Sequence, residues 1–215
     1  MYMKEYMNTN VITVNSKTAI LEAEKTMSDH KIRRLPVVDN GKLVGILTQR
    51  KVREATICPV TSLNVWELNY LLSKTTVKDI MERNLFTVTP DMPVEQAVSK
   101  AQERMIGTLL VVEENDRSKL IGIATATDLY KLTTQILAFG QKGVRLHIFE
   151  PARTGSCEEV LSMVIELGVG IRSMFHVTVP RMNKEDCIIH LKTESATEVI
   201  DSLRAKGYEV EVRQS

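Results

Sequence analysis

Two periods alternate in the hydrophobic pattern at the start of the chain. Val11–Val14, Leu35–Val38 and Leu43–Leu47 are short β-rich runs, and Asp39–Gly41 between the last two is a hairpin turn signal. Between the first two runs, apolar residues recur at helical spacing: Ala19, Ile20, Ala23 and Met27. The pattern predicts a strand, a helix, two strands joined by a hairpin, and a second helix.

The same pattern occurs twice, because the chain begins with an internal repeat. Four blocks match in order, three at an offset of 74 residues and the last at an offset of 77: Lys4–Met7 (KEYM) with Lys78–Met81 (KDIM), Val11–Val14 with Leu85–Val88, Leu35–Val38 with Leu109–Val112, and Lys42–Thr48 with Lys119–Thr125. The change of offset indicates a three-residue insertion around Glu113–Ser118. Leu63–Leu72 predicts a helix connecting the repeats, and a last helix is expected from Asp128 to about Phe139.

From Val144 onward the repeat stops and a different order begins. Four strands are predicted, at Val144–Ile148, Ile171–Val179, Cys187–Lys192 and Tyr208–Val212. Two capping boxes, Ser156 with Glu159 and Ser195 with Glu198, each open a helix, and Gly168 and Gly207 end them. The order βαββαβ predicts a four-stranded antiparallel sheet covered by two helices, so the whole chain is of the mixed α/β (α+β) class.

Composition and charge exclude several classes of protein. The chain has 215 residues, 43% of them hydrophobic and 26% charged, as in ordinary globular proteins. With 28 basic and 27 acidic residues the formal charge is +1, which argues against a nucleic-acid coat or a polybasic membrane binder. No run has the roughly 18 apolar residues of a membrane span, and no apolar signal core begins the chain, so a cytoplasmic protein is expected.

The residue types that carry chemistry are scattered. Three cysteines (Cys58, Cys157 and Cys187) and four histidines show no metal-ligand or Cys-x-x-Cys spacing, so we expect no metal site, and Cys157 and Cys187 are interpreted as small hydrophobic residues. The chain also lacks a Gly-x-Ser-x-Gly elbow, a Walker-type phosphate loop and a His-Glu-x-x-His pair. We therefore expect no enzymatic activity.

The repeats resemble the tandem cystathionine-β-synthase (CBS) domain family. The resemblance covers about residues 1–140 and rests on Arg33–Asp39 (RRLPVVD), the two Gly-Ile segments at Gly45 and Gly122, and Thr125 with Asp128 in Gly122–Asp128 (GIATATD). It implies that the two repeats form one Bateman module. The tail resembles the ACT domain family through its ferredoxin-like βαββαβ order, and the combination of the two is similar to the AcuB-type proteins of acetoin utilisation. The domains expected are a first CBS repeat at 1–60, a connector at 61–76, a second repeat at 77–140 and an ACT-like domain at 144–215.

CBS pairs bind adenosine ligands between their repeats, so the resemblance implies AMP, ADP, ATP or S-adenosylmethionine as a regulatory ligand. The Asp128 carboxylate can accept both hydroxyls of a ribose, and Thr125 offers a hydroxyl at the same helix start, where free backbone N–H groups favour an anion. Leu85–Thr87 and Leu109–Val111 are apolar edges for a flat base, through Thr87, Leu109 and Val111 in particular. By resemblance, Arg33 and Arg34 face the phosphates, which guanidinium groups bind bidentately.

The two half-sites differ. Lys51 stands in the first repeat where the family has its ribose-binding Asp, and Gly107-Thr108 stands in the second repeat where the first has Arg33-Arg34. These complementary losses predict one composite nucleotide site per chain. The degenerate pocket would contain Thr13, Thr48 and Lys51, and is either empty or filled by Lys51 paired with a carboxylate. The plainer alternatives are that Asp128 and Thr125 only cap their helix and that the arginines form a solvated face.

These observations favour a non-catalytic sensor of adenine nucleotides. A structural adaptor with a vestigial site, and a small enzyme that uses the nucleotide as substrate, are the alternatives. The ACT-like tail either dimerises the chain or binds a small effector at the loop Glu150–Gly155, and its longer loop favours the dimer. The expected partners are thus a nucleotide, a second copy of the chain and a regulated protein, with no membrane and no nucleic acid.

Overall fold

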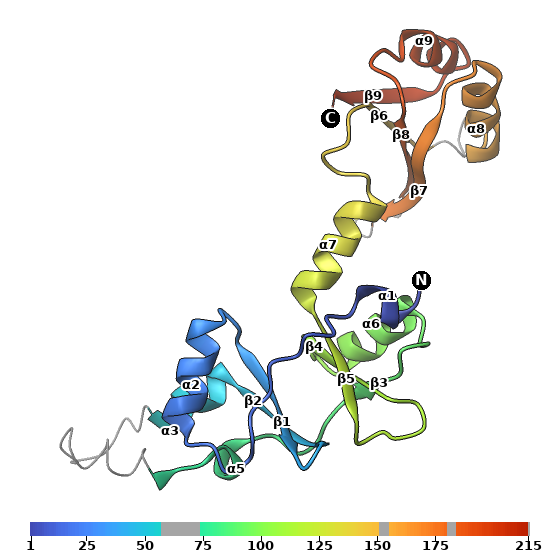
Figure 1. Ribbon diagram of the computed structural model, residues 1–215. Helices are drawn as coiled ribbons and strands as arrows, with labels where there is room; N and C mark the ends of the chain where they lie inside the picture. Colours follow the sequence, from blue (N-terminus) through green and yellow to red (C-terminus); the bar gives the residue numbers. More distant parts are fainter. Residues whose placement is uncertain (57–73, 151–154, 180–183, 215) are drawn as a thin grey trace. The chain divides into compact units, whose positions relative to one another are not determined.

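The computed structural model describes residues 1–56, 74–150, 155–179 and 184–214 (Figure 1). The described residues form two compact units, Met1–Leu129 and Tyr130–Ser215. Both units combine helices and strands, as the sequence predicts. The expected connecting helix at Leu63–Leu72 lies outside the described residues. None of the helices that the structure describes is long and apolar enough to cross a membrane.

The first unit contains the two repeats. Its elements are α1 (Met3–Tyr6), α2 (Ile20–Asp29), β1 (Arg34–Asp39), β2 (Lys42–Thr48), α3 (Gln49–Thr56), α5 (Val77–Ile80), β3 (Thr87–Val88), α6 (Val94–Glu103), β4 (Thr108–Val112), β5 (Leu120–Thr125) and the start of α7 (Ala126–Ile136). β1 and β2 form an antiparallel hairpin whose turn residues Asn40 and Gly41 have φ of 51° and 78°, and β3 runs parallel to β4 in the sheet β3-β4-β5. The predicted strand Val11–Val14 is reduced to one parallel bridge between Val14 and Val37.

Each repeat buries one face of its first long helix, and in the first repeat this is the predicted stripe. In the first repeat, Ala23 and Met27 of α2 pack with β1 and β2 in one apolar cluster. In the second, α6 buries Val94, Ala97 and Ala101, and every residue of β4 is buried. β4 is the central strand of its sheet, between β3 and β5, and because side chains alternate along a strand, the burial of all its residues means that both of its faces are covered.

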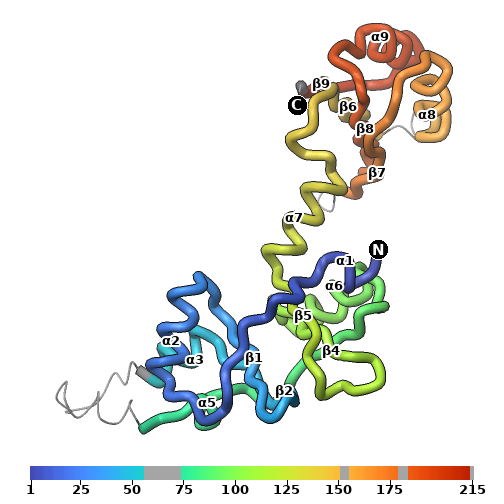
Figure 2. The backbone as a smooth tube through the Cα atoms, viewed as in Figure 1, coloured from blue at the N-terminus to red at the C-terminus, as the bar shows by residue number. Residues whose placement is uncertain are grey.

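The segment that leads into each repeat packs on the other repeat (Figure 2). At the N-terminus, Met3 N donates to Met92 O at 3.0 Å and Asn8 N donates to Ile123 O at 2.8 Å, so residues 1–8 lie on the second repeat. Conversely, Glu82 and Ile46 exchange two backbone hydrogen bonds of 2.9 Å, so the segment after α5 lies on the first repeat.

Two methionines complete this exchange. A Cβ added at Gly45 of β2 would lie 2.5 Å from Sδ of Met81, and a Cβ at Gly122 of β5 would meet Sδ of Met7. Gly45 and Gly122 are matched positions of the two repeats, as are Met7 and Met81. The KEYM and KDIM blocks therefore supply the side chain that fills the space above the glycine of the opposite repeat.

The second unit has the predicted βαββαβ order. Its elements are β6 (Val144–Phe149), α8 (Cys157–Glu166), β7 (Ile171–Val179), β8 (Lys184–Leu191), α9 (Thr197–Ala205) and β9 (Glu209–Gln214). The strands form one antiparallel sheet in the order β7-β8-β6-β9, which is the ferredoxin-like arrangement. Val144, Leu146 and Ile148 of β6 point into a core shared with α8 and α9.

The two predicted capping boxes differ from expectation. Ser156 caps α8 by accepting from the backbone N–H of Glu159 at 3.2 Å, but the Glu159 carboxylate accepts from Lys206 Nζ at 2.7 Å and Tyr208 Oη at 3.0 Å instead of returning to the cap. Only half of this box forms, because Glu159 has stronger partners on the neighbouring segment.

At α9 the prediction is wrong. The helix begins at Thr197 with Ala196 as its N-cap, and no side chain caps it. The Ser195 N–H donates to Thr193 Oγ1 at 3.2 Å, which holds Ser195 in the preceding turn. Gly207, with φ of 90°, follows the C-terminal end of the helix, as predicted.

The face of this sheet opposite the helices is partly covered by the chain that precedes it. Arg145 Nη2 donates to the Leu137 carbonyl at 2.6 Å, and Arg172 Nη1 donates to Gln141 Oε1 at 2.7 Å. His190, on this face of β8, is 0% exposed. Residues 137–143 therefore cover part of this face, and the side chains that they cover or bind are polar.

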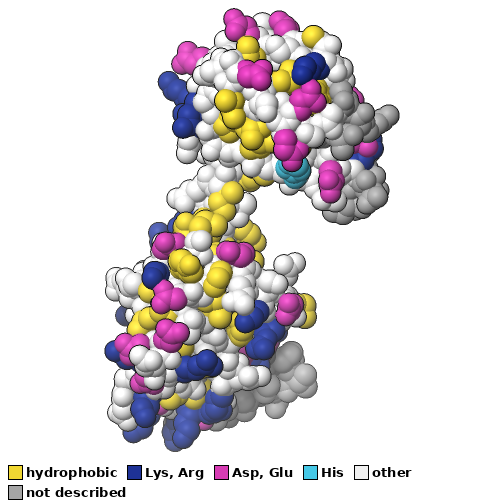
Figure 3. All heavy atoms as spheres, turned by 90° about the vertical axis from the view of Figure 1, so that its right-hand side faces the viewer, with side chains coloured by type: hydrophobic (Ala, Val, Ile, Leu, Met, Phe, Trp, Pro, Cys, Tyr) yellow, Lys and Arg dark blue, Asp and Glu magenta, His cyan; other side chains and the backbone are white. Residues whose placement is uncertain are grey.

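The surface agrees with the near-neutral charge. On the face drawn in Figure 3, both units carry basic and acidic side chains.

Candidate functional site

Thr125 and Asp128 form the start of α7. Both the backbone N–H and the hydroxyl of Thr125 donate to Asp128 Oδ2, at 2.9 and 2.7 Å. Thr125 is the last residue of β5, so this pair sits where the strand passes into the helix. The plainer interpretation, a helix cap, is therefore realised. The same interaction fixes the carboxylate at the helix start, where it can accept from the hydroxyl of a ligand.

Arg34 crosses from the first repeat to this helix start. An added Cβ at Gly107 would lie 3.2 Å from Nη2 of Arg34, so the guanidinium lies against the Gly107 backbone. The carbonyl of Gly107 in turn accepts from the N–H of Ala126, the first residue of α7, at 3.2 Å. Since Gly107 and Ala126 belong to the second repeat, residues from both repeats meet here, as the composite-site prediction requires.

The charge of Arg34 is incompletely balanced. Burial is the main reason that the pKa of its guanidinium is lowered, the neighbouring Arg33 adds to the effect, and Glu82 opposes it. Within the described ranges, Arg34 has no ion pair within 4.0 Å. Arg33 is exposed. A half-buried guanidinium without an ion-pair partner is a ready site for an anion.

The residues expected to flank a base are less open than predicted. Thr87 is half-buried in β3, opposite Leu110 of β4. Leu109 and Val111 are 1% and 0% exposed, because β4 is covered on both faces. Their side chains belong to the core, so a base in this region would meet their backbone unless the core opened.

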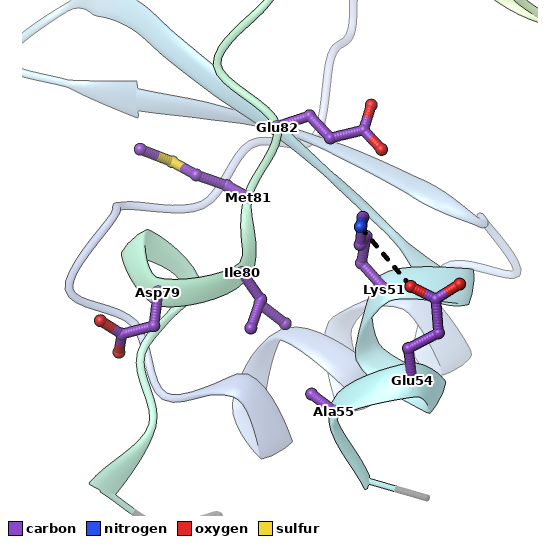
Figure 4. A pocket seen from close by; sticks show the side chains of 7 residues that line it. All are labelled: Lys51, Glu54, Ala55, Asp79, Ile80, Met81 and Glu82. Carbon is purple, nitrogen blue, oxygen red and sulfur yellow. Dashed lines mark ion pairs between the residues drawn. The ribbon is translucent and has the colours of Figure 1, made fainter.

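The pocket of the first repeat lies at the corresponding helix start. It has a volume of about 390 Å³ and is shown in Figure 4 with its lining residues: Lys51, Glu54, Ala55, Asp79, Ile80, Met81 and Glu82. Lys51 Nζ pairs with Glu54 Oε2 at 3.5 Å. The lysine thus pairs with a carboxylate, and it lines the pocket and does not fill it.

The other residues assigned to this pocket have structural roles or stand apart. Thr48 Oγ1 accepts from the Lys51 N–H at 3.3 Å, which matches the hydroxyl position of Thr125 in the second repeat. Asp79 caps α5 by accepting from the N–H and the hydroxyl of Thr76 at 2.8 and 2.7 Å. Thr13 is exposed and is not among the residues that line the pocket.

At the two helix starts, the positive and the negative side chain have exchanged positions. Lys51 and Glu54 of α3 correspond, at the offset of 77, to Asp128 and Lys131 of α7. The scaffold is thus duplicated while the charge that faces a ligand is reversed. This asymmetry favours different ligand chemistry at the two positions.

The loop considered for an effector in the tail is only partly described, since residues 151–154 lie outside the described ranges. A Cβ at Gly155 would meet Tyr208 Oη and Glu159 Oε2. Gly155 is therefore needed for close packing inside the unit, which accounts for it without an effector.

Comparison with known proteins identifies the repeats. The model of the CBS domain family matches residues 3–57 and 77–133. The chain belongs to the CBS domain family. A CBS domain-containing protein of Dictyostelium discoideum is 35% identical over 136 residues, which are 63% of this chain and 92% of the relative. L-aspartate semialdehyde sulfurtransferase of Methanocaldococcus jannaschii is 32% identical over 60% of this chain, but the match spans only 23% of that enzyme.

Solved structures of CBS pairs agree with this assignment. The CBS domain pair of protein MJ0100, in complex with 5′-methylthioadenosine and S-adenosyl-L-methionine, is 31% identical, with a TM-score of 0.51 over 62% of this chain and 95% of that one. AcuB from Vibrio cholerae, assigned to acetoin utilization, is 25% identical, with a TM-score of 0.53 over 64% of this chain and 93% of that one. The family match ends at residue 133, so the ACT-like character of the tail stays a prediction.

The fold also brings together residues that the sequence keeps apart. Ligand atoms of Cys157, His176 and Cys187 lie within 4.8 Å of one another. The expectation of no metal site rested on linear spacing, which does not reveal a cluster built from three elements. The available signal was the hairpin of β7 and β8, because its register sets His176 opposite Cys187.

Proposed function

We propose that the chain is a non-catalytic regulatory protein that binds an adenine nucleotide between its CBS repeats. Asp128 and Thr125 hold the ribose, while Arg34 and Arg33 bind the phosphates. The observation that carries the proposal is the half-buried guanidinium of Arg34, which lies against Gly107 beside the start of α7 without an ion-pair partner in the described structure. In this proposal Thr87, Leu109 and Val111 flank the base.

The class of ligand is supported by a relative of known structure. The CBS pair of MJ0100 was solved with 5′-methylthioadenosine and S-adenosyl-L-methionine, which both contain adenosine. Neither ligand has a phosphate, and S-adenosyl-L-methionine carries a positive sulfonium. Two neighbouring guanidinium groups favour an anion over a cation, so we propose AMP, ADP or ATP as the ligand here.

Regulation follows if the nucleotide binds one arrangement of the repeats better than another. A ligand shifts such an equilibrium only by its difference in affinity for the two states. A site shared by Arg34 and Asp128 has that property, because its two halves belong to different repeats. In the proposal the ACT-like tail dimerises and passes the change to a regulated partner in the cytoplasm. The likeness to AcuB makes acetoin utilisation the first pathway to examine.

A structural adaptor with a vestigial site is the second candidate. It is favoured by the burial of Leu109 and Val111, which leaves little room for a base beside β4, and by the ion pair of Lys51 with Glu54, which engages the charge of the lysine at the other pocket. A thermal-shift panel of AMP, ADP, ATP, S-adenosylmethionine and candidate amino acids separates the two candidates. Stabilisation by a nucleotide supports the sensor, and no response to any compound supports the adaptor.

Calorimetry with Asp128→Asn tests the site. The amide keeps one oxygen to cap α7 but loses the charge and an acceptor for the ribose hydroxyls. We expect one nucleotide per chain for the native protein and at least about tenfold weaker binding for the variant. Asp79→Asn is the matched control, since Asp79 makes the same cap at α5. Equal affinity in native protein and Asp128→Asn would remove Asp128 from the site.

A further inference from the structure

Two thiols and an imidazole meet in the second unit. Sγ of Cys157, Sγ of Cys187 and a ring nitrogen of His176 all lie within 4.8 Å of one another. We propose that these three side chains bind a divalent metal ion that prefers sulfur and nitrogen ligands, with Zn²⁺ as the expected occupant. The site is independent of the nucleotide site proposed for the repeats.

Regular elements hold all three ligands. Cys157 is the first residue of α8, directly after its N-cap Ser156. His176 of β7 and Cys187 of β8 are opposite each other in the antiparallel register. Opposite residues share a face of the sheet, with Cβ atoms about 4.5–5.5 Å apart. Sites on helices and strands are positioned more precisely than sites on loops, so the cluster is preorganised.

The burial of the cluster suits a metal that is bound from one side. Cys157 and Cys187 are buried and belong to the core of the unit, whereas His176 is exposed. Two ligands thus lie inside and one at the surface, which leaves an outward position for a water molecule. Three protein ligands and a water form the coordination of an open zinc site, and Cys₂His is one of its ligand sets.

The surrounding charge also favours a cation. Burial is the largest cause of the raised pKa of the Cys157 thiol, and hydrogen bonding with Cys187 partly offsets it. Glu158 directly follows Cys157 in α8, and Glu185 lies two residues before Cys187, on the same face of β8. A divalent cation would be stabilised by the same carboxylates.

Small adjustments complete the geometry. With Zn–S near 2.3 Å and Zn–N near 2.0–2.1 Å, ligand atoms around tetrahedral zinc are about 3.5–3.8 Å apart. The present separations of up to 4.8 Å require a contraction of about 1 Å, within reach of a change of rotamer at the exposed His176. Packing alone accounts for two thiols in a core but not for an imidazole on the same face beside them.

Binding is a simple exchange of protons for metal. Both cysteines are free, and an ordinary thiol carries its proton at neutral pH. When Zn²⁺ binds, two S–H bonds break, two Zn–S bonds and one Zn–N bond form, and two protons pass to solvent. No oxidant or reductant takes part. The soft ligands exclude Mg²⁺ and Ca²⁺, which prefer oxygen.

Titration of the reduced full-length chain with Co²⁺, followed by displacement with Zn²⁺, tests the proposal. We expect one Co²⁺ per chain, with thiolate-to-cobalt charge-transfer bands that Zn²⁺ removes. His176→Ala should weaken binding by at least about tenfold without unfolding the protein, because its side chain is exposed. Cys157→Ser and Cys187→Ser should abolish the charge-transfer bands.

Matched controls use the remaining residues of the same types. Cys58→Ser and His30→Ala should leave cobalt binding unchanged. Circular dichroism confirms that each variant is folded. Three results would overturn the proposal: no cobalt or zinc binding by the reduced protein, binding that survives both cysteine substitutions, and binding that is lost in the cysteine variants but unchanged in His176→Ala. The last result would assign a two-thiol site without the imidazole.

Discussion

The thioether of Met81 rests on Gly45, at a point where a methyl group on the glycine would be 2.5 Å from the sulfur. Met7 occupies the equivalent place over Gly122 in the other repeat. Two motifs that are far apart in the sequence, the KDIM block and the glycine of β2, are thus the two sides of one contact. The contact explains why a glycine is required in a strand interior, where it is otherwise unfavourable.

Gly45→Ala should therefore destabilise the first unit. The added methyl group overpacks the contact with Met81, at an expected cost of about 1–3 kcal/mol in the free energy of unfolding. Urea denaturation of the variant measures the loss, and Met81→Ala in the same background should recover part of it. Gly170→Ala is the control, because its Cβ would meet only the flexible side chain of Lys192. Equal losses in the two glycine variants would refute the contact as the cause.

Arg34→Ala should weaken the binding of nucleotides more than that of adenosine. A charged hydrogen bond to phosphate contributes about 1.5–3 kcal/mol, so the affinity for ATP should fall at least about tenfold while that for adenosine changes little. Gly107→Ala should give a smaller loss, because its Cβ would crowd the guanidinium without removing the charge. Arg117→Ala, in the exposed loop between β4 and β5, is the control. Equal losses for ATP and adenosine would show that Arg34 does not bind phosphate.

His190 should make the second unit sensitive to acid. Burial lowers the pKa of its imidazole from 6.5, and Arg145 and Arg172 lower it further. The unfolded chain then takes up the proton at a higher pH than the folded chain, so stability falls as the pH drops below about 6.5 towards the folded-state pKa. The slope is at most about 1.4 kcal/mol per pH unit. Urea unfolding between pH 7.5 and pH 5 measures it.

His190→Leu should reduce this loss of stability between pH 7.5 and pH 5. The substitution removes the titrating group from this buried position, together with its interaction with the Ala138 backbone, which raises the pKa of the imidazole. An NMR titration of the native imidazole provides a second readout if the variant does not fold. An unchanged slope in the variant, or an imidazole that titrates near 6.5, would contradict the prediction.

Cys187 should make the second unit less stable at high pH. Burial and the neighbouring Cys157 raise the pKa of its thiol to about 12 from 9.0. Between these values the unfolded chain has lost the proton while the folded chain keeps it, so stability is retained below about pH 9 and falls as the pH rises. The loss is at most about 4 kcal/mol at the end of the range. Unfolding of the metal-free protein from pH 8 to 10.5, compared with Cys187→Ala, measures its beginning.

Elements that depend on local sequence were predicted well. The stripe of Ala23 and Met27 is buried as expected, and the turn at Asn40 and Gly41 has the positive φ values that its residue types favour. The βαββαβ order of the tail also follows from periodicity and from helix-ending glycines such as Gly207. In each case the residues that decide the structure lie close together in the chain.

Features that depend on distant partners were not predicted. Glu159 leaves its capping box because Lys206 and Tyr208 are brought beside it by folding. Leu109 and Val111 are buried because folding covers the face of β4 on which they stand. The contact of Arg34 with Gly107 was not predicted: family resemblance placed the arginines only toward the phosphates, and no spacing along the chain reveals a contact between repeats.

The two repeats cannot be separated into independent pieces, because the segment that precedes each repeat packs on the other. Residues 1–8 serve the second repeat and the stretch after α5 serves the first, so neither repeat is a contiguous piece that carries its own packing partners. A cut between them would expose Gly45 and Gly122 together with the apolar surface that Met81 and Met7 cover. The pair is thus one interlocked body, and any rotation of one repeat against the other must pull on both connecting segments at once.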